Sequence, residues 1–334
     1  MATWTELLTE FMSQGDNARA VAWLDAQMQQ RLTDIASLRG DRNVLLYGSG
    51  FLQKPDVPAP LLMLSPEDVD GLMATLHGMD WTKNLVLILH TPGGATNAAE
   101  TVVAYLRSKF ARIEVIVPTY AMSAGSMLAL AADHIVMGRQ SQLGPIDPQM
   151  QVGGRMISAR AVVEQFKRAQ RDVVGDPESG AVGDLAMAHV WAPVLATIGP
   201  ALLQEAINAL EFSERMVRDW LAAYMFRSHP SRDSQAAMVA AHFNDASKHL
   251  SHGRRIDRDE CRSLDLDIED LEAEQTLQEA VLTLYHLMTI AFQQSPATKL
   301  LRSTSGVQWL KQWQPPQQTV MPMRQILVPG APAQ

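Results

Sequence analysis

This chain has little of what disulfide-bonded, membrane-spanning and nucleic-acid-binding proteins depend on. Its only cysteine is Cys261, which excludes an internal disulfide and most metal sites built from cysteine. No apolar run approaches the roughly 18 residues that indicate a transmembrane helix. Acidic residues outnumber basic ones, 36 against 28, and the net charge of −8 makes nucleic acid or an anionic membrane an unexpected partner.

The first residues also lack the features of an export signal. The segment MATWTELLTEF carries Glu6 and Glu10 and has no basic stretch ahead of an apolar one. No phosphate-binding P-loop and no internal repeat occurs. We therefore expect a cytoplasmic globular protein, and 334 residues with 47% hydrophobic content suffice for a large core.

What the sequence does have is a serine between a buried strand and a helix. The β-branched apolar run Ile113–Val117 predicts a strand in the middle of a sheet, and Pro118 ends it. From Ser123 onward the spacing of apolar residues predicts a packed helix. A serine at such a junction lies near unpaired helix N–H groups, which favour developing negative charge. It is either an activated nucleophile or a simple helix cap.

A second predicted strand ends in a glycine-rich loop. The run Leu85–Leu89 is followed by His90 and then by TPGG, and a helix is expected over Ala98–Arg107. Two successive β-α units predict a parallel sheet, in which the loops after neighbouring strands emerge at the same edge. We therefore expect the N–H groups of Gly94 and Ala124 to converge on one oxygen.

These motifs and their spacing resemble those of a known superfamily. TPGG, followed 29 positions after Gly94 by the serine of AMSAG, is similar to the Clp protease proteolytic subunit and to signal peptide peptidase A. The closer resemblance is to the bacterial and archaeal serine dehydrogenase proteinase family of the same ClpP/crotonase superfamily. The segments GSGFLQKP (48–55), DHIVMGRQSQLGPIDPQ (133–149) and VVEQFKRA (162–169) also carry it.

The resemblance implies an α/β fold with a ClpP/crotonase-like core of repeated β-α units and a mainly parallel sheet. It implies Ser123 as the nucleophile, with the Gly94 and Ala124 amides as the oxyanion hole. Ser126 is the nearby competitor, but it falls one helical turn too late for the motif.

The general base is less clear. In Clp-type peptidases a histidine lies close to the position that Asp147 occupies here, 24 residues after Ser123, but no histidine occurs between His134 and His189. Asp147 lies in the rigid loop SQLGPIDPQ, where it either orients the site or has a structural role in the loop.

In peptidases of the signal-peptide type the base is a desolvated lysine. Lys167 is the first candidate here, because it lies at the margin of the apolar stripe of a helix expected over 158–174. The alternative for Lys167 is a solvated side chain that flanks the stripe.

Histidines supply the secondary base candidates. In the related family a histidine recurs in a segment like SHGRRI, which points to His252, and His90 directly precedes the TPGG loop. His242 and His249 are seven residues apart, which is not the spacing of a zinc pair on a helix. We expect neither a metal nor a cofactor.

Three parts are expected along the chain: an N-terminal helical extension (1–40), the peptidase core (41–270), and a C-terminal helix with a Pro/Gln-rich extended tail (271–334). Within the core, 43–47 and 134–137 read as strands. Ser65 and Pro66 read as the cap and first position of a helix.

The resemblance implies a cytoplasmic serine peptidase that hydrolyses peptides or unfolded protein segments. It also implies a homo-oligomer, a ring or stacked trimers, with a separate regulator or unfoldase as a further partner. A catalytically idle scaffold or partner-binding protein is the alternative, because the histidine of Clp-type peptidases is missing at its usual position. A crotonase-like acyl-CoA enzyme is less favoured, since no features of a CoA pocket are found.

Overall fold

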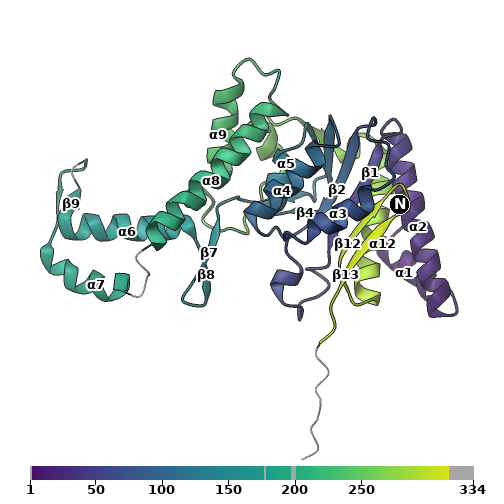
Figure 1. Ribbon diagram of the computed structural model, residues 1–334, viewed down its shortest axis with the longest axis horizontal. Coiled ribbons are helices and arrows are strands. Elements are labelled where there is room, and N and C mark those ends of the chain that lie inside the picture. Colours follow the sequence, from purple (N-terminus) through teal and green to yellow (C-terminus); the bar gives the residue numbers. More distant parts are fainter. Residues whose placement is uncertain (1, 177, 197–200, 316–334) are drawn as a thin grey trace, which may run out of the picture.

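The computed structural model describes residues 2–176, 178–196 and 201–315. A seven-stranded sheet lies at its centre (Figure 1). Its order is β11-β5-β3-β2-β1-β12-β13, and the five strands from β11 to β1 pair in parallel. The strands are β1 (Asn43–Ser49), β2 (Leu85–His90), β3 (Ile113–Val117), β5 (His134–Met137), β11 (Ile268–Asp270), β12 (Ala297–Ser303) and β13 (Gln308–Gln312). The predicted α/β fold with a mainly parallel sheet is confirmed.

Helices cover both faces of this sheet. On β2, Leu85, Leu87 and Leu89 enter one core, and Val86 and Ile88 enter the other, as the alternation of side chains along a strand requires. The first face is covered by α3 (Asp68–Leu76), α4 (Thr96–Arg107), α5 (Ala124–Leu130), α8 (Leu202–Ala223), α9 (Arg232–Asn244) and α11 (Arg258–Ser263). The second face is covered by α1 (Trp4–Met12), α2 (Asn17–Leu38) and α12 (Gln275–Gln294).

The N-terminal helices pack on their own sheet. Leu24, Met28 and Leu32 of α2 are buried in the same core as Leu284 and Met288 of α12. These apolar residues recur at the three- and four-residue steps of an amphipathic helix.

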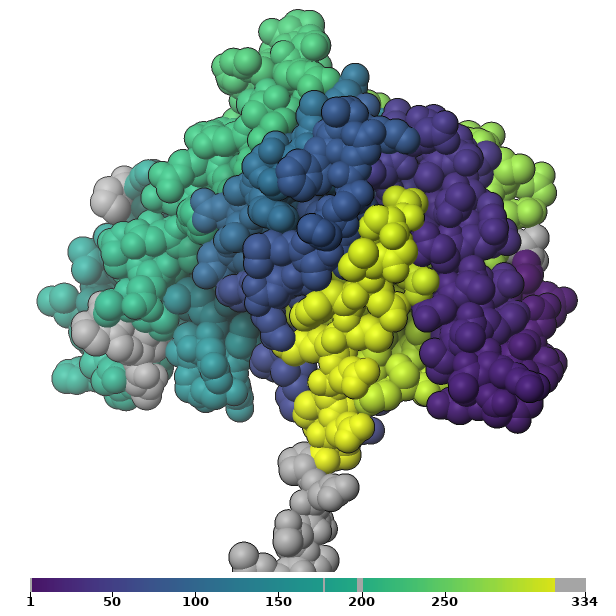
Figure 2. Space-filling view, turned by 45° about the vertical axis from the view of Figure 1, so that its right-hand side comes forward, coloured from purple at the N-terminus to yellow at the C-terminus, as the bar shows by residue number. Residues whose placement is uncertain are grey.

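The C-terminal segment differs from the prediction. The extended tail expected after the C-terminal helix was wrong as far as Gln312, because β12 pairs antiparallel with β1 and β13 pairs with β12. Figure 2 shows this hairpin (yellow) between the N-terminal helices (purple) and the first β-α units (blue). The sheet therefore extends past the boundary expected at residue 270. Residues 316–334 lie outside the described part.

The start of α3 also differs from the expected cap. The helix begins at Asp68, and Glu67, at the cap position, makes no side-chain capping bond. Asp68 is fully buried and bonds Lys299 of β12 instead. An acid in the first turn of a helix usually lies in solvent and interacts with the helix dipole. Asp68 instead lies in the core.

A helical arm leaves the core after β5. It contains the hairpin β7 (Gln149–Val152) and β8 (Arg155–Ser158), then α6 (Ala159–Val174), β9 (Gly175–Asp176), β10 (Ala181–Val182) and α7 (Ala188–Ala196). In Figure 1, α6, α7 and β9 extend to the left, away from the main sheet. α7 has no buried residue, and Val182 is 96% exposed. In the described part of the chain, no helix combines the length and the apolar character needed to cross a membrane.

A second, narrower row of paired segments lies beyond the carboxyl ends of the main strands. The two-residue strands β4 (Tyr120–Ala121) and β6 (Gln142–Leu143) pair in parallel. Single bridges extend the row on both sides, Thr91 to Ala121 and Leu143 to Ile256. Four separate parts of the chain are therefore held side by side just after β2, β3 and β5 end.

Candidate active site

Ser123 has the backbone conformation of a sharp turn between β4 and α5. Its φ is +52° and its ψ is −117°, a region in which a residue with a side chain is strained by about 1–3 kcal/mol. The residue occupies the cap position of α5, but its side chain caps no helix amide. The hydroxyl takes part in no hydrogen bond with the described residues, so the simple cap expected as the alternative is not formed.

The first glycine of the TPGG loop lies directly against this serine. Gly93 has φ +96°, and a Cβ added there would lie 2.6 Å from the Ser123 Cβ and 3.1 Å from the Ala124 nitrogen. No side chain fits at that distance. The glycine-rich loop and the serine turn, 30 residues apart in sequence, are therefore in contact.

The second glycine is held by a third segment. The Leu64 N–H donates to the Gly93 carbonyl over 2.7 Å, and the Leu64 carbonyl accepts from the Ala95 N–H over 3.0 Å. This is a parallel bridge between Leu64 and Gly94, and in such a bridge the N–H of Gly94 points away from Leu64. Among the described residues, the Gly94 N–H has no acceptor.

The amide of Ala124 is available in the same way. It is the first residue of α5, and its N–H is one of those that a helix leaves without an intrahelical partner. No described residue accepts a hydrogen bond from it. The amide of Ala124 and that of Gly94, which follows the glycine in contact with Ser123, thus have the composition of an oxyanion site.

An aspartate and a histidine are brought together by the narrow row of segments. Asp147 comes four residues after Leu143, and His252 comes four residues before Ile256. Since Leu143 and Ile256 pair antiparallel, continuing the register places Asp147 opposite His252. The structure shows this contact, with Asp147 Oδ1 and His252 Nδ1 2.8 Å apart.

The environment of this pair suits a base and its orienting acid. The Asp147 side chain is 1% exposed, and its second oxygen accepts from Gln149 Nε2 over 2.8 Å. His252 is 30% exposed. A carboxylate accepts a hydrogen bond from Nδ1–H, so this contact fixes the tautomer with a lone pair on Nε2. Asp147 therefore does more than hold its own loop.

The structure does not place Lys167 in the role expected of it. Its side chain is 54% exposed on α6 and its Nζ pairs with Glu164 over 3.3 Å. A lysine base requires burial that destabilises the ammonium form, and that burial is missing here. The structure thus brings His252, and not Lys167, into contact with a buried acid.

His90 and Ser126 are buried and engaged elsewhere. His90 is 0% exposed among the rings of Phe51, Tyr120 and Tyr285, and burial lowers its pKa to about 3. Ser126 Oγ donates to the Ala121 carbonyl over 2.7 Å and accepts from the Gly144 N–H over 2.8 Å. Ser126 therefore ties β4 to the segment after β6 and is not a free nucleophile.

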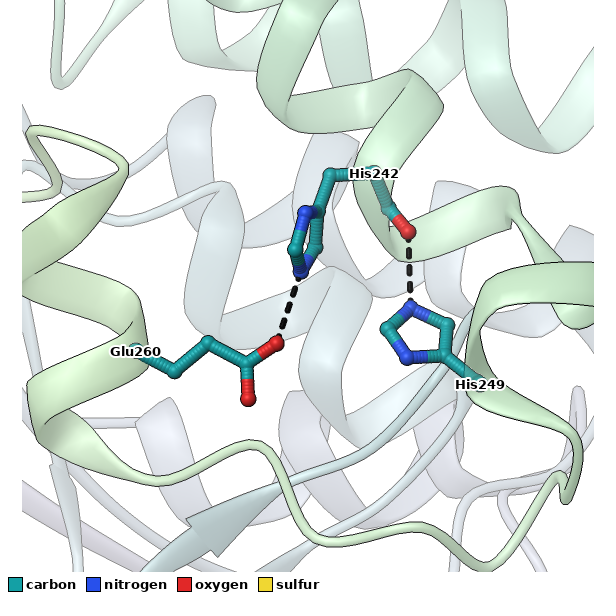
Figure 3. A group of neighbouring side chains, drawn as sticks. All are labelled: His242, His249 and Glu260. Atoms are coloured by element: carbon teal, nitrogen blue, oxygen red, sulfur yellow. Dashed lines mark hydrogen bonds and ion pairs between the residues drawn. The ribbon is translucent and has the colours of Figure 1, made fainter.

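A cluster of two histidines and an acid comes from residues that precede and follow the His252 segment in sequence, and Figure 3 shows these three side chains. His242 of α9, His249 of α10 (Ala246–His249) and Glu260 of α11 offer ligand atoms that all lie within 4.8 Å of one another. These atoms already have partners. His242 Nε2 bonds Glu260 over 2.9 Å, and one Arg254 nitrogen lies 2.9 Å from both His249 and Glu260.

A guanidinium at the centre of this cluster competes with any metal cation for the same ligand atoms. The hydrogen bonds join α9, α10 and α11 across the segment that carries His252. Holding that segment is the role these contacts support.

Residues 62–188 match the family of ClpP-like SDH-type serine proteinases. The resemblance drawn from the sequence is confirmed over this stretch, which contains Ser123, Gly94, Ala124 and Asp147. His252 lies beyond it.

Two curated relatives from Methanocaldococcus jannaschii, the uncharacterized proteins MJ0137 and MJ1495, match shorter segments. The first is 43% identical over 84 residues, 25% of this chain and 29% of the relative. The second is 50% identical over 105 residues, 31% of this chain and 35% of the relative. The chain thus spans about a third of the length of these relatives.

Solved structures give weak likenesses. A mutant of the 1510-N membrane-bound stomatin-specific protease is 14% identical, with a TM-score of 0.24, over 38% of this chain and 71% of that one. ThnE from S. clavuligerus is 16% identical, with a TM-score of 0.19, over 61% of this chain and 93% of that one.

Sequence reasoning ranked Lys167 above His252, whereas the structure places His252, and not Lys167, against Asp147. The useful signal was Asp147 itself, an acid between Ile146 and Pro148 in a rigid loop. A buried acid in such a place needs a charged or hydrogen-bonding partner. The partner comes from 105 residues away, so no local pattern identifies it.

Proposed function

We propose that this protein is a serine peptidase with Ser123 as nucleophile, His252 as general base and Asp147 as the orienting acid. The observation that carries the proposal is the Asp147–His252 hydrogen bond, which lies in the row of paired segments that also contains the strand before Ser123. The Ser123 backbone is strained, and its hydroxyl bonds none of the described residues. The family matched by residues 62–188 supports the reaction class.

The chemistry follows the usual acyl-enzyme course. Ser123 Oγ attacks the carbonyl carbon of a peptide while His252 Nε2 takes the hydroxyl proton. The carbonyl oxygen, now negative, is held by the Gly94 and Ala124 amides. His252 then gives its proton to the leaving amine as the carbon–nitrogen bond breaks. Water, activated by the same imidazole, hydrolyses the ester and frees Ser123.

Substrate and assembly are part of the proposal. We expect peptides or unfolded segments as substrates, because a nucleophile in a narrow row of extended segments suits an extended chain. Exposed apolar side chains on the arm, Val174, Val182 and Leu185, support self-association through that surface.

The idle-scaffold alternative rested on the lack of a base. His252, oriented by a buried acid, supplies a base candidate and so favours the peptidase. The acyl-CoA alternative gains no observation from the described residues.

Labelling with a fluorophosphonate probe, read by intact mass, tests the proposed function. One adduct on the wild-type protein, with none on Ser123→Ala and much slower labelling of His252→Gln, is the expected result. Full labelling of Ser123→Ala, or none of the folded wild type at any pH, contradicts it.

A further inference from the structure

A buried ion pair lies on the far side of the segment that holds the glycine-rich loop. Lys299 of β12 and Asp68 of α3 are each 0% exposed, and the lysine Nζ lies 2.9 and 2.8 Å from the two carboxylate oxygens. The Tyr47 hydroxyl of β1 donates to the same carboxylate over 3.0 Å. Three elements of the sheet region thus meet at one acid.

The carboxylate also bonds the backbone next to Leu64. The Ser65 N–H donates to Asp68 Oδ2 over 2.8 Å, and Lys299 Nζ lies 3.3 Å from the Ser65 hydroxyl. Both groups of the ion pair therefore act on Ser65. The residue before it, Leu64, has its position fixed by these bonds.

Leu64 in turn sets the position of Gly94. Its N–H and its carbonyl bond the residues on either side of Gly94, and a Cβ on Gly94 would lie 2.2 Å from the Leu64 oxygen. The backbones are in such close contact that a shift of Leu64 must move the Gly94 peptide. An oxyanion donor is effective only within a few tenths of an ångström of its proper position. Even a small shift of Leu64 should therefore weaken the hydrogen bond from the Gly94 amide.

Stability alone does not explain why this position holds an ion pair. Replacing a buried pair with well-packed apolar side chains is often neutral or stabilising, whereas removing one partner leaves an unpaired buried charge. What apolar residues at 68 and 299 would lack is the acceptor for the Ser65 N–H. The pair therefore supplies a directional contact that an apolar core does not.

We propose that Asp68 and Lys299 are positioning residues for the oxyanion hole, acting through Ser65 and Leu64 on the amide of Gly94. This inference rests on the proposed function, because the geometry of the Gly94 amide matters only if an oxyanion forms beside Ser123. Neither residue touches the substrate.

The test compares Asp68→Asn with a matched control, Asp133→Asn. Asp133 is also buried, pairs with Arg107 over 2.7 Å and accepts the Ile113 N–H over 2.8 Å. It lies at the amino ends of β3 and β5, the edge of the sheet opposite to Ser123. Both variants lose a buried ion pair, but only one affects Leu64.

We expect Asp68→Asn to lower kcat for peptide hydrolysis and the fluorophosphonate rate by about 10–10²-fold, with little change in KM, because the amide acts in the transition state. Exchange of the Leu64 and Ala95 amide hydrogens should accelerate. Asp133→Asn should lower the melting temperature without either effect. Equal rates and equal exchange in the two variants overturn the inference.

A double variant distinguishes an effect on the position of the Gly94 amide from a loss of folding. Asp68→Leu with Lys299→Met removes both charges and should still fold, although the Tyr47 hydroxyl and the Ser65 N–H lose their acceptor, while kcat stays low. Full kcat in this folded variant overturns the inference and leaves the proposed function intact. A folded wild type that takes no label overturns the proposed function, and this inference with it.

Discussion

The Asp147 carboxylate and the His252 ring lie 2.8 Å apart although 105 residues separate them in sequence. The contact joins the loop after β6 to the segment before α11. Removing the acid should leave the histidine in place but free to rotate, and the tautomer would no longer be fixed.

Asp147→Asn should lower kcat by about 10²–10⁴-fold, because an amide at this position favours the wrong tautomer of His252. The fold should be retained, since Asn has the shape of Asp. Steady-state kinetics of peptide hydrolysis, with circular dichroism to check the fold, measure this. Unchanged kcat would show that Asp147 serves its loop only.

Lys167 and His252 should differ sharply when each loses its titratable group. His252→Gln should lower kcat by about 10²–10⁴-fold, the typical loss for a general base. Lys167→Met should leave kcat unchanged, since the side chain is exposed and paired with Glu164. The reverse result would restore the lysine mechanism.

Gly94→Ala should abolish acylation. Its φ is +157° and the new Cβ would lie 2.2 Å from the Leu64 oxygen, so the loop must move. Gly78→Ala is the control, because its φ is +80° and no heavy atom lies within 4 Å of the added Cβ. The control should cost about 1–2 kcal/mol of stability from its strained backbone. It should keep the wild-type rate of labelling.

Acid should destabilise the fold through His90. Burial lowers its pKa to about 3, while an unfolded histidine titrates near 6.5. Between these values the unfolded state binds a proton that the folded state does not, so stability falls as the pH is lowered.

At pH 4.5 the loss relative to pH 7 should be about 2–3 kcal/mol. Urea unfolding at the two pH values should show a smaller difference for His90→Asn than for the wild type. The exposed His77→Asn serves as control and should behave like the wild type. An undiminished difference in His90→Asn would contradict the assignment.

The arm should mediate self-association. Val182 and Leu185 are 96% and 78% exposed, so Val182→Asp with Leu185→Asp should weaken assembly at little cost to the fold. Met12→Asp, at a 67% exposed position on α1, is the control. Light scattering after gel filtration measures the mass. A wild type that is monomeric at high concentration would contradict the prediction.

The repeated β-α units were predictable because their signals are local. The strand runs Leu85–Leu89 and Ile113–Val117, each followed by its loop and helix, appear in the structure nearly as expected. Buried parallel strands give continuous apolar runs, which a sequence displays directly.

The features that were not predicted depend on distant partners. Lys299 lies inside a strand and Asp68 at a helix start, and nothing local shows that each compensates the charge of the other. The strands at 297–312 were mistaken for a tail, because their lysines and glutamines interrupt the apolar pattern. β12 forms because it pairs antiparallel with β1, more than 240 residues earlier in the chain, and no local pattern reveals such a partner.

The position of β12 has a consequence for how the protein is made. During synthesis the N-terminal parts of a chain are available to fold first. The serine turn and the glycine loop leave the ribosome long before β12, whose Lys299 completes the contacts around Asp68. A nascent chain that ends before residue 299 therefore contains Ser123 and the glycine-rich loop but lacks the lysine that pairs with Asp68.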